Sequence, residues 1–155
     1  MNPSSPALLP VNHVQQRYQS DCLATCVDMV LRFFNTAIAY RRLLKVLKTD
    51  PTVGTPFSNI VNLRQLRLTV VYQQGDLAQL HTFVDNGWPV IVPVETRELP
   101  YWHEQSNHAV VVIGMDAQAI YINDPAFASA PLQVPRGDFD LAWLEHDESY
   151  AVLAT

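Results

Sequence analysis

The feature that most constrains the fold is a strongly apolar run in the second half of the chain, HAVVVIG, at residues 108–114. A tight polar turn at 116–118 separates it from a second apolar run, AIYIN, at 119–123. Two runs of strand length joined by so short a link predict an antiparallel hairpin. The chain is therefore expected to build a β-sheet, with further strands at 69–72, 90–94 and 150–153.

The first half of the chain has the periodicity of helices instead. Between residues 23 and 34 polar side chains recur at spacings of three and four, and the rest are apolar or small. This pattern predicts a mostly buried helix that starts near Cys22, with Ser20 or Asp21 as its cap. Further helices are expected at 39–48, 56–66 with Thr55 as cap, 77–86 between Asp76 and Gly87, and 135–144. Helices packed on an antiparallel sheet make an α+β fold.

Length and composition favour one compact domain, residues 1–155, and exclude several classes of protein. With 155 residues and 48% hydrophobic content the chain can bury one real core. The net charge of -5 is scattered and offers no basic surface to nucleic acid. The longest apolar runs fall far short of the ~20 residues of a membrane helix, and the N-terminus lacks the features of a signal peptide. We expect a cytoplasmic protein with no membrane segment and no nucleic-acid partner, and leave its oligomeric state open.

The two cysteines, Cys22 and Cys26, lie four residues apart in the first predicted helix. Because the chain shows no secretory features, this placement favours free thiols over a disulfide. The spacing is not that of a zinc or thioredoxin-type site, and no second pair of ligands accompanies it. We therefore expect no metal and no cofactor, and interpret Cys26 as a packed core thiol.

Cys22 is placed where a cysteine can become a nucleophile. It starts a helix, and the unpaired amides and dipole of a helix N-terminus favour the thiolate. The carboxylate of Asp21 acts in the opposite direction, so a positively charged partner is required. For any cysteine taken alone, a small buried core residue is the simpler interpretation.

A partner is available in His108, which opens the apolar HAVVVIG strand, a rigid mount for a catalytic base. Asp124 follows sixteen residues later, at the end of the next strand, in the sequence INDP. If the two strands pair through the turn at 116–118, their outer ends lie side by side and bring Asp124 within reach of His108. Taken singly, His108 could be a hydrogen-bonded histidine at a sheet edge and Asp124 a turn residue before proline.

Gln16 lies six residues before Cys22, on the segment that leads into the nucleophile helix. Its side-chain amide could donate one hydrogen bond to a developing oxyanion while the backbone N–H of Cys22 donates another. The alternative is a solvent-facing glutamine, with Gln15 and Gln19 as competitors for the same role.

The segments QRYQSDCLATCVDM, HAVVVIG and INDP resemble the glutamine, cysteine, histidine and aspartate motifs of the double-glycine leader peptidases, papain-like cysteine proteases usually fused to bacteriocin-exporting ABC transporters. The resemblance extends from about residue 14 to 153. It implies a papain-like fold in which the cysteine helix packs against the sheet that carries the histidine. It also implies that Cys22 is the nucleophile, His108 the base, Asp124 the orienting acid and Gln16 the oxyanion donor.

Two features depart from that family. Leu23 stands where the family usually has glycine directly after the cysteine, which predicts a narrower site or a changed approach of the substrate. No transporter follows the domain in this sequence, so the chain resembles the freestanding bacterial members.

The leading functional hypothesis is a cysteine peptidase that hydrolyses peptide bonds in a peptide or protein substrate, such as a peptide leader. The same residues could carry out another acyl transfer, as a deamidase, a transglutaminase-like enzyme or an isopeptidase. A third hypothesis is a peptide-binding module without catalysis. The presence of Cys22, His108 and Asp124 together argues against this last one, because binding alone does not require all three.

Overall fold

The structure, a computed structural model, describes residues 6–155, so the first five residues of the predicted domain lie outside the described residues. Its helical elements are the 3-10 turns η1 (Gln19–Asp21), η2 (Phe57–Leu66) and η3 (Thr96–Glu98), and the α-helices α1 (Cys22–Phe33), α2 (Tyr40–Val46), α3 (Leu77–Asp85) and α4 (Arg136–Leu144). The strands are β1 (Thr69–Gln74), β2 (Val90–Glu95), β3 (Asn107–Met115), β4 (Ala119–Asn123), β5 (Leu132–Pro135) and β6 (Ser149–Ala154).

The strands form one six-stranded sheet in the order β1-β6-β2-β3-β4-β5, and every pairing is antiparallel. The predicted hairpin is present as β3 and β4, so the α+β prediction is confirmed. β5 was not predicted. It is a four-residue edge strand that ends at Pro135, and an edge is the position in a sheet that tolerates a proline because no ladder hydrogen bond is lost.

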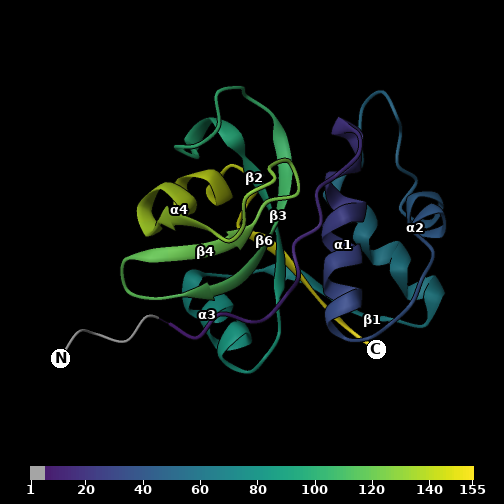
Figure 1. Ribbon diagram of the computed structural model, residues 1–155, viewed down its shortest axis with the longest axis horizontal. Helices are drawn as coiled ribbons and strands as arrows, with labels where there is room; N and C mark the ends of the chain where they lie inside the picture. The colour runs from purple at the N-terminus through teal and green to yellow at the C-terminus, as the bar shows by residue number, and fades with distance from the viewer. Residues whose placement is uncertain (1–5) are drawn as a thin grey trace.

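Helices cover both faces of the sheet (Figure 1). α1, α2 and η2 pack on one face, while α3 and α4 pack on the other. Along β3, Ala109, Val111 and Ile113 belong to the core under α1, whereas Val110 and Val112 belong to the core under α3 and α4. Because alternate strand residues point to opposite faces, a strand covered on both sides must be apolar throughout, which accounts for the HAVVVIG run.

The helix ends agree only in part with the predicted caps. α3 begins with a reciprocal capping box between Asp76 and Gln79, and Gly87 follows it with a φ of +87°. The segment predicted as a helix at 56–66 is a 3-10 helix, and Thr55 does not cap it because its N-cap is Pro56. Asp21 is the N-cap of α1 but makes no side-chain capping bond; its carboxylate instead accepts a hydrogen bond of 3.0 Å from the Tyr40 hydroxyl.

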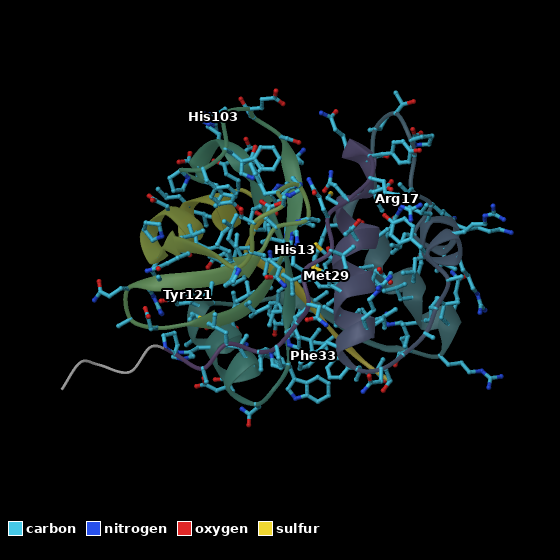
Figure 2. The ribbon with its side chains drawn as sticks, viewed as in Figure 1. His13, Arg17, Met29, Phe33, His103 and Tyr121 are labelled. Carbon is cyan, nitrogen blue, oxygen red and sulfur yellow. The ribbon has the colours of Figure 1, made fainter. Side chains whose placement is uncertain are left out.

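The segment that precedes η1 lies along the sheet before it enters α1 (Figure 1). The Leu9 amide donates to the carbonyl of Ile113 on β3 at 2.8 Å. Gly114 has no side chain where a Cβ would stand 2.5 Å from Leu8, so glycine permits this close approach. The segment therefore connects the β3–β4 hairpin to the start of α1. Further along α1, the side chain of Met29 points toward the sheet and belongs to the core (Figure 2).

No helix within residues 6–155 combines the length and apolar character needed to cross a bilayer.

Candidate active site

Cys22 and Cys26 lie one turn apart on α1 but in different environments. Cys22, the first residue of the helix, is partly exposed and lines a cleft. Cys26 is fully buried, and burial together with negative charge at Cys22 raises the pKa of its thiol. A protonated, inaccessible thiol is a poor nucleophile, so only Cys22 is available for chemistry.

His108 and Asp124 meet as the hairpin predicts. The Nε2 atom of His108, the second residue of β3, donates a hydrogen bond of 2.6 Å to Oδ1 of Asp124, which directly follows β4. The side chains are 4% and 0% exposed, respectively. Because Nε2 is committed to Asp124, Nδ1 is the ring nitrogen left for a second partner.

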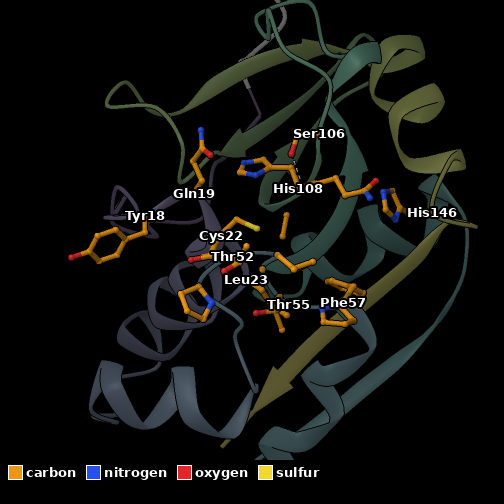
Figure 3. Close-up of a pocket in the computed structure, with 17 residues that line it drawn as sticks. Tyr18, Gln19, Cys22, Leu23, Thr52, Thr55, Phe57, Ser106, His108 and His146 are labelled. Carbon is orange, nitrogen blue, oxygen red and sulfur yellow. Dashed lines mark hydrogen bonds between the residues drawn. The ribbon is translucent and has the colours of Figure 1, made fainter.

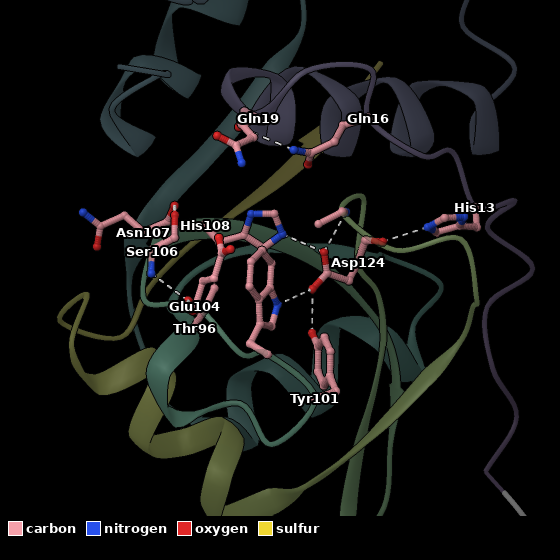
Figure 4. Close-up of polar contacts among 12 residues, drawn as sticks. His13, Gln16, Gln19, Thr96, Tyr101, Glu104, Ser106, Asn107, His108 and Asp124 are labelled. Atoms are coloured by element: carbon pink, nitrogen blue, oxygen red, sulfur yellow. Dashed lines mark hydrogen bonds and ion pairs between the residues drawn. The ribbon is translucent and has the colours of Figure 1, made fainter. Parts of the chain in front are cut away.

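Four donors surround the Asp124 carboxylate (Figure 4). Oδ1 accepts from His108 and from the backbone amide of Ala126 at 2.9 Å. Oδ2 accepts from the Tyr101 hydroxyl at 2.6 Å and from the indole Nε1 of Trp102 at 3.0 Å. Two hydrogen bonds at each oxygen satisfy a buried carboxylate, which fixes its position and its ionised state.

Hydrogen bonds also fix the backbone of the turn that carries Asp124. Nε2 of His13 donates to the Asp124 carbonyl at 2.8 Å, and the side-chain amide of Asn123 donates to the Val11 carbonyl at 2.9 Å. The segment before η1 therefore fixes the turn that presents Asp124.

The electrostatics of the pair follow from this geometry. Burial by itself lowers the pKa of His108, but hydrogen bonds and charge at Asp124 and Cys22 raise it to about 9. For Asp124, burial acts to raise the pKa, and the hydrogen bond and charge of His108 outweigh it, so the pKa is lowered. At neutral pH the imidazole is therefore a cation beside Cys22, the positively charged partner that the thiol needs.

Aromatic rings enclose the pair on the sheet side. The Trp102 ring lies edge-on to His108 with centroids 4.9 Å apart, and Phe127 packs edge-on against Trp102 at 5.2 Å and Tyr101 at 5.1 Å. These rings keep water from the His108–Asp124 hydrogen bond, which strengthens it.

A cleft of about 680 Å³ lies between the start of α1 and the start of β3 (Figure 3). Cys22 and Leu23 line it from the helix, His108 from the sheet, and residues 51–57 from the connection between α2 and η2. Leu23 is only 1% exposed and belongs to the core. The residue in place of the family glycine therefore directs its bulk mainly into the protein and contributes one wall of the cleft.

A second cleft, of about 470 Å³, also has His108 in its lining. Gln16, Trp102 and Phe127 are among the side chains that line it. Among the described residues, Cys22 lines only the first cleft, whereas His108 lines both.

Gln16 lies in the second cleft and not in the one that holds Cys22. Its Nε2 donates to the carbonyls of Tyr18 at 3.0 Å and Gln19 at 3.4 Å, and its buried Oε1 has no partner within residues 6–155. Gln19 lines both clefts, as His108 does. Gln19 therefore shares a cleft with Cys22, whereas Gln16 does not, and the Gln16 amide is already hydrogen-bonded to backbone carbonyls.

Residues 8–150 match the Peptidase C39-like family. The chain belongs to this family of peptidases. No curated protein matches it significantly.

The C39-like assignment agrees with solved structures. A putative C39-like peptidase from Bacillus anthracis is 20% identical, with a TM-score of 0.77 over 98% of each chain. The peptidase domain of Streptococcus ComA, a bifunctional ABC transporter involved in quorum sensing, is 21% identical, with a TM-score of 0.74 over 93% of this chain and 98% of the other. A double glycine motif protease from an AMS/PCAT transporter, solved with its leader peptide, is 19% identical, with a TM-score of 0.73 over 96% of each chain. The predicted family and fold are thus confirmed.

Two side chains of this C39-like site were not identified from the sequence. Tyr101 and Trp102 lie in the loop between η3 and β3, and both donate to Asp124. Their only signal in the sequence is that their loop runs directly into His108. Which carboxylate oxygen they reach depends on how the loop folds back.

Within residues 6–155 no group of three or more histidine, cysteine or acidic side chains is arranged to hold a metal ion.

Proposed function

We propose that this C39-like chain is a cysteine peptidase in which Cys22 is the nucleophile, His108 the acid and base, Asp124 the orienting carboxylate and Gln16 an oxyanion donor. The observation that carries the proposal is the buried His108–Asp124 hydrogen bond of 2.6 Å beside the only accessible cysteine of the described chain. A structural histidine would not need a carboxylate with four donors and an adjacent thiol.

The first half of the reaction forms a thioester. The thiolate sulfur of Cys22 attacks the carbonyl carbon of the scissile bond, and the electron pair of the C=O bond moves to oxygen. The Cys22 backbone amide and the Gln16 side chain stabilise this oxyanion. As the C–N bond breaks, protonated His108 gives its Nδ1 proton to the leaving amine.

The second half releases the acid. Neutral His108 takes a proton from water through Nδ1, and the hydroxide oxygen attacks the thioester carbonyl. The C–S bond breaks, and the Cys22 thiolate and the His108 cation are restored. Throughout, Nε2 remains hydrogen-bonded to Asp124, which keeps the ring in one orientation.

The substrate class that best fits is a peptide with an extended segment before the cut, such as a leader peptide. The related double glycine motif protease is described in complex with a leader peptide, and the groove beside Cys22 here is open enough for an extended chain. Free thiols at both cysteines suit a reducing compartment, so we place the activity in the cytoplasm.

The proposal is tested by incubating purified protein with a proteome-derived peptide library and tagging new N-termini for mass spectrometry. Cys22→Ala is the inactive control. We expect cleavage products that appear only with the wild-type protein, without released ammonia. Ammonia release or cross-linked peptides would instead indicate a deamidase or a transglutaminase-like enzyme. If no product of any kind depended on Cys22, the remaining hypothesis would be a peptide-binding module without catalysis.

A further inference from the structure

The charged side chains divide between the two halves of the chain, so the expectation of scattered charge is wrong. Eight of the ten lysines and arginines lie in residues 17–67, together with only three of the fifteen acidic residues. The other twelve acidic residues and two arginines lie in residues 76–148. The first half, which contains α2, is therefore positive, and the second half, which contains α4, is strongly negative. These two helices lie on opposite sides of the molecule (Figure 1).

The positive charge of the first half is concentrated on α2 and just after it. Four exposed basic side chains lie there, those of Arg41, Arg42, Lys45 and Lys48. None of them forms an ion pair within residues 6–155. Arg41 and Lys45 are one turn apart on the same side of α2. We call these four side chains the basic face.

The three acidic residues of the first half do not neutralise the basic face. Asp21 and Asp28 are buried and already hydrogen-bonded to other side chains. Asp50 is exposed, but its carboxylate accepts hydrogen bonds from the backbone amides of residues 52 and 53. The basic face therefore keeps its positive charge toward solvent.

The end of α2 does not need the lysines as caps. Basic side chains near a helix C-terminus often bind its last carbonyls. Here the carbonyls of Val46 and Leu47 accept from the side-chain amides of Asn62 and Asn59, at 3.1 and 2.9 Å respectively. Because η2 already supplies these caps, the ammonium groups of the basic face remain available to a ligand.

The basic face continues into the active site. The two clefts that share His108 form the active-site groove. Its wall beside Cys22 is formed by residues 51–57, the connection between α2 and η2 (Figure 3). This wall begins three residues after Lys48. A peptide that leaves the groove across this wall therefore reaches the basic face.

We propose that the basic face binds an acidic segment of the peptide substrate, on a stretch that lies outside the active-site groove. This inference rests on the proposed peptidase function. The negative half of the molecule repels the same segment, so the two halves together steer an acidic peptide toward the α2 side of the groove.

Two other anionic partners fit the structure less well. A helix that lies on a membrane presents apolar side chains beside its basic ones, whereas none of the large exposed hydrophobic residues in the described part of the chain lies on α2. A nucleic acid carries negative charge along its whole length, so a bound duplex would extend from the basic face toward the negative half. A short acidic peptide segment avoids both difficulties.

The first test uses the same peptide library and aligns the sequences around each cut. We expect aspartate and glutamate to be enriched about 2-fold or more at positions several residues away from the cut, on one side of it, as an exposed charge pair allows. Cuts that depend on Cys22 but show no such enrichment would overturn the inference and leave the proposed function intact.

The second test reverses one charge of the basic face. Lys45→Glu is assayed on a well-cleaved acidic peptide and on a matched peptide in which glutamine and asparagine replace its glutamate and aspartate. The control is Arg67→Glu, which makes the same change of charge at an exposed residue at the other end of η2 from the groove.

We expect Lys45→Glu to raise KM for the acidic peptide about 3-fold or more at low salt, with kcat unchanged, because an attraction becomes a repulsion. In about 0.5 M NaCl the increase should fall below about 2-fold, since salt screens exposed charges. KM for the neutral peptide should stay the same, and Arg67→Glu should change KM for neither peptide.

An unchanged KM in Lys45→Glu, or an equal increase in Arg67→Glu, would overturn the inference. Binding of duplex DNA or of phosphatidylserine vesicles that Lys45→Glu abolishes, with no effect on KM, would assign the basic face to that partner instead. Failure of the wild-type protein to cleave either peptide would count against the proposed function itself.

Discussion

The two walls of the active-site groove differ in how completely their polar atoms are paired. On the sheet wall, formed by His108 and Asp124, the Asp124 carboxylate accepts four hydrogen bonds, two at each oxygen. On the helix wall, formed by Gln16 and Cys22, the Gln16 amide is only half paired: its Nε2 donates to two backbone carbonyls, whereas its buried Oε1 has no partner within residues 6–155. The thiol is partly exposed.

The difference shows which wall must be rigid before substrate arrives. The sheet wall sets the orientation and charge of the imidazole, and its hydrogen bonds exist without substrate. On the helix wall, under the proposed function, Nε2 of Gln16 would exchange its carbonyl partners for the oxyanion, which is present only during the reaction. Changes to the sheet wall should therefore alter the resting enzyme as well as turnover, and changes to the helix wall should act on turnover alone.

The largest effect is expected at the nucleophile. Cys22→Ala should lower kcat at least about 10⁴-fold, because no thioester can form. Cys26→Ala, one turn along the same helix, should retain activity within a few-fold. Iodoacetamide at mildly acidic pH, read by peptide mapping, should modify Cys22 and spare Cys26. Labelling that disappears only in the Cys26 variant would reverse the assignment.

The role of the sheet wall is tested by replacing Asp124. A protonated His108 can donate to an amide carbonyl as well as to a carboxylate, so the sequence alone predicts that Asp124→Asn keeps far more activity than Asp124→Ala. The structure changes this expectation, because either orientation of the asparagine turns its NH₂ group toward a pair of donors. Both variants should lose about 10² to 10⁴-fold in kcat. Near wild-type turnover in the folded Asn variant, checked by circular dichroism, would show that the four-donor arrangement is dispensable.

The helix wall is tested by comparing the two glutamines. Gln16→Ala should lower kcat about 10²-fold with little change in the thermal midpoint, as expected for an oxyanion donor. Gln19→Ala, three residues away in the same groove, should change kcat only slightly. The opposite result would assign the oxyanion to Gln19, and a lowered midpoint with unchanged kinetics would make Gln16 a structural residue.

A smaller effect is expected from a positioning residue of the sheet wall. Tyr101→Phe removes one hydrogen bond to a buried carboxylate, which is worth about 1.5 to 3 kcal/mol. We expect kcat to fall about 10-fold with KM unchanged, because Tyr101 touches Asp124 and is not among the residues that line the groove. An increase in KM alone would indicate that Tyr101 binds substrate instead.

The smallest effect concerns stability and pH. The folded-state pKa of His108, about 9, lies above its ordinary value of 6.5. Its contribution to stability is therefore complete below pH 6.5 and is lost as the pH rises through about 9, by an amount on the order of 1 to 3 kcal/mol. Between pH 6.5 and 9.5 the free energy of unfolding, measured with urea, should fall more in the wild type than in His108→Gln. An equal fall with pH in both proteins would show that His108 is not held as a cation.

Much of this fold was decided locally in the sequence. The β3–β4 hairpin, the start of α1 and the capping box of α3 each depend on neighbouring residues, so periodicity and turn chemistry were sufficient to predict them. The pairing of His108 with Asp124 belongs to the same class, because a hairpin with a short turn necessarily brings its outer ends together.

Other features were decided only by the tertiary structure. The donors from Tyr101 and Trp102 come from a loop outside the hairpin, and the position of that loop depends on Thr96 and on the packing of Phe127. Likewise, the second cleft exists only because three distant segments converge at His108. The sequence by itself determined which residues could react, since that depends on short spacings. Which of their atoms are paired depended on contacts between segments far apart along the chain, which no local pattern encodes.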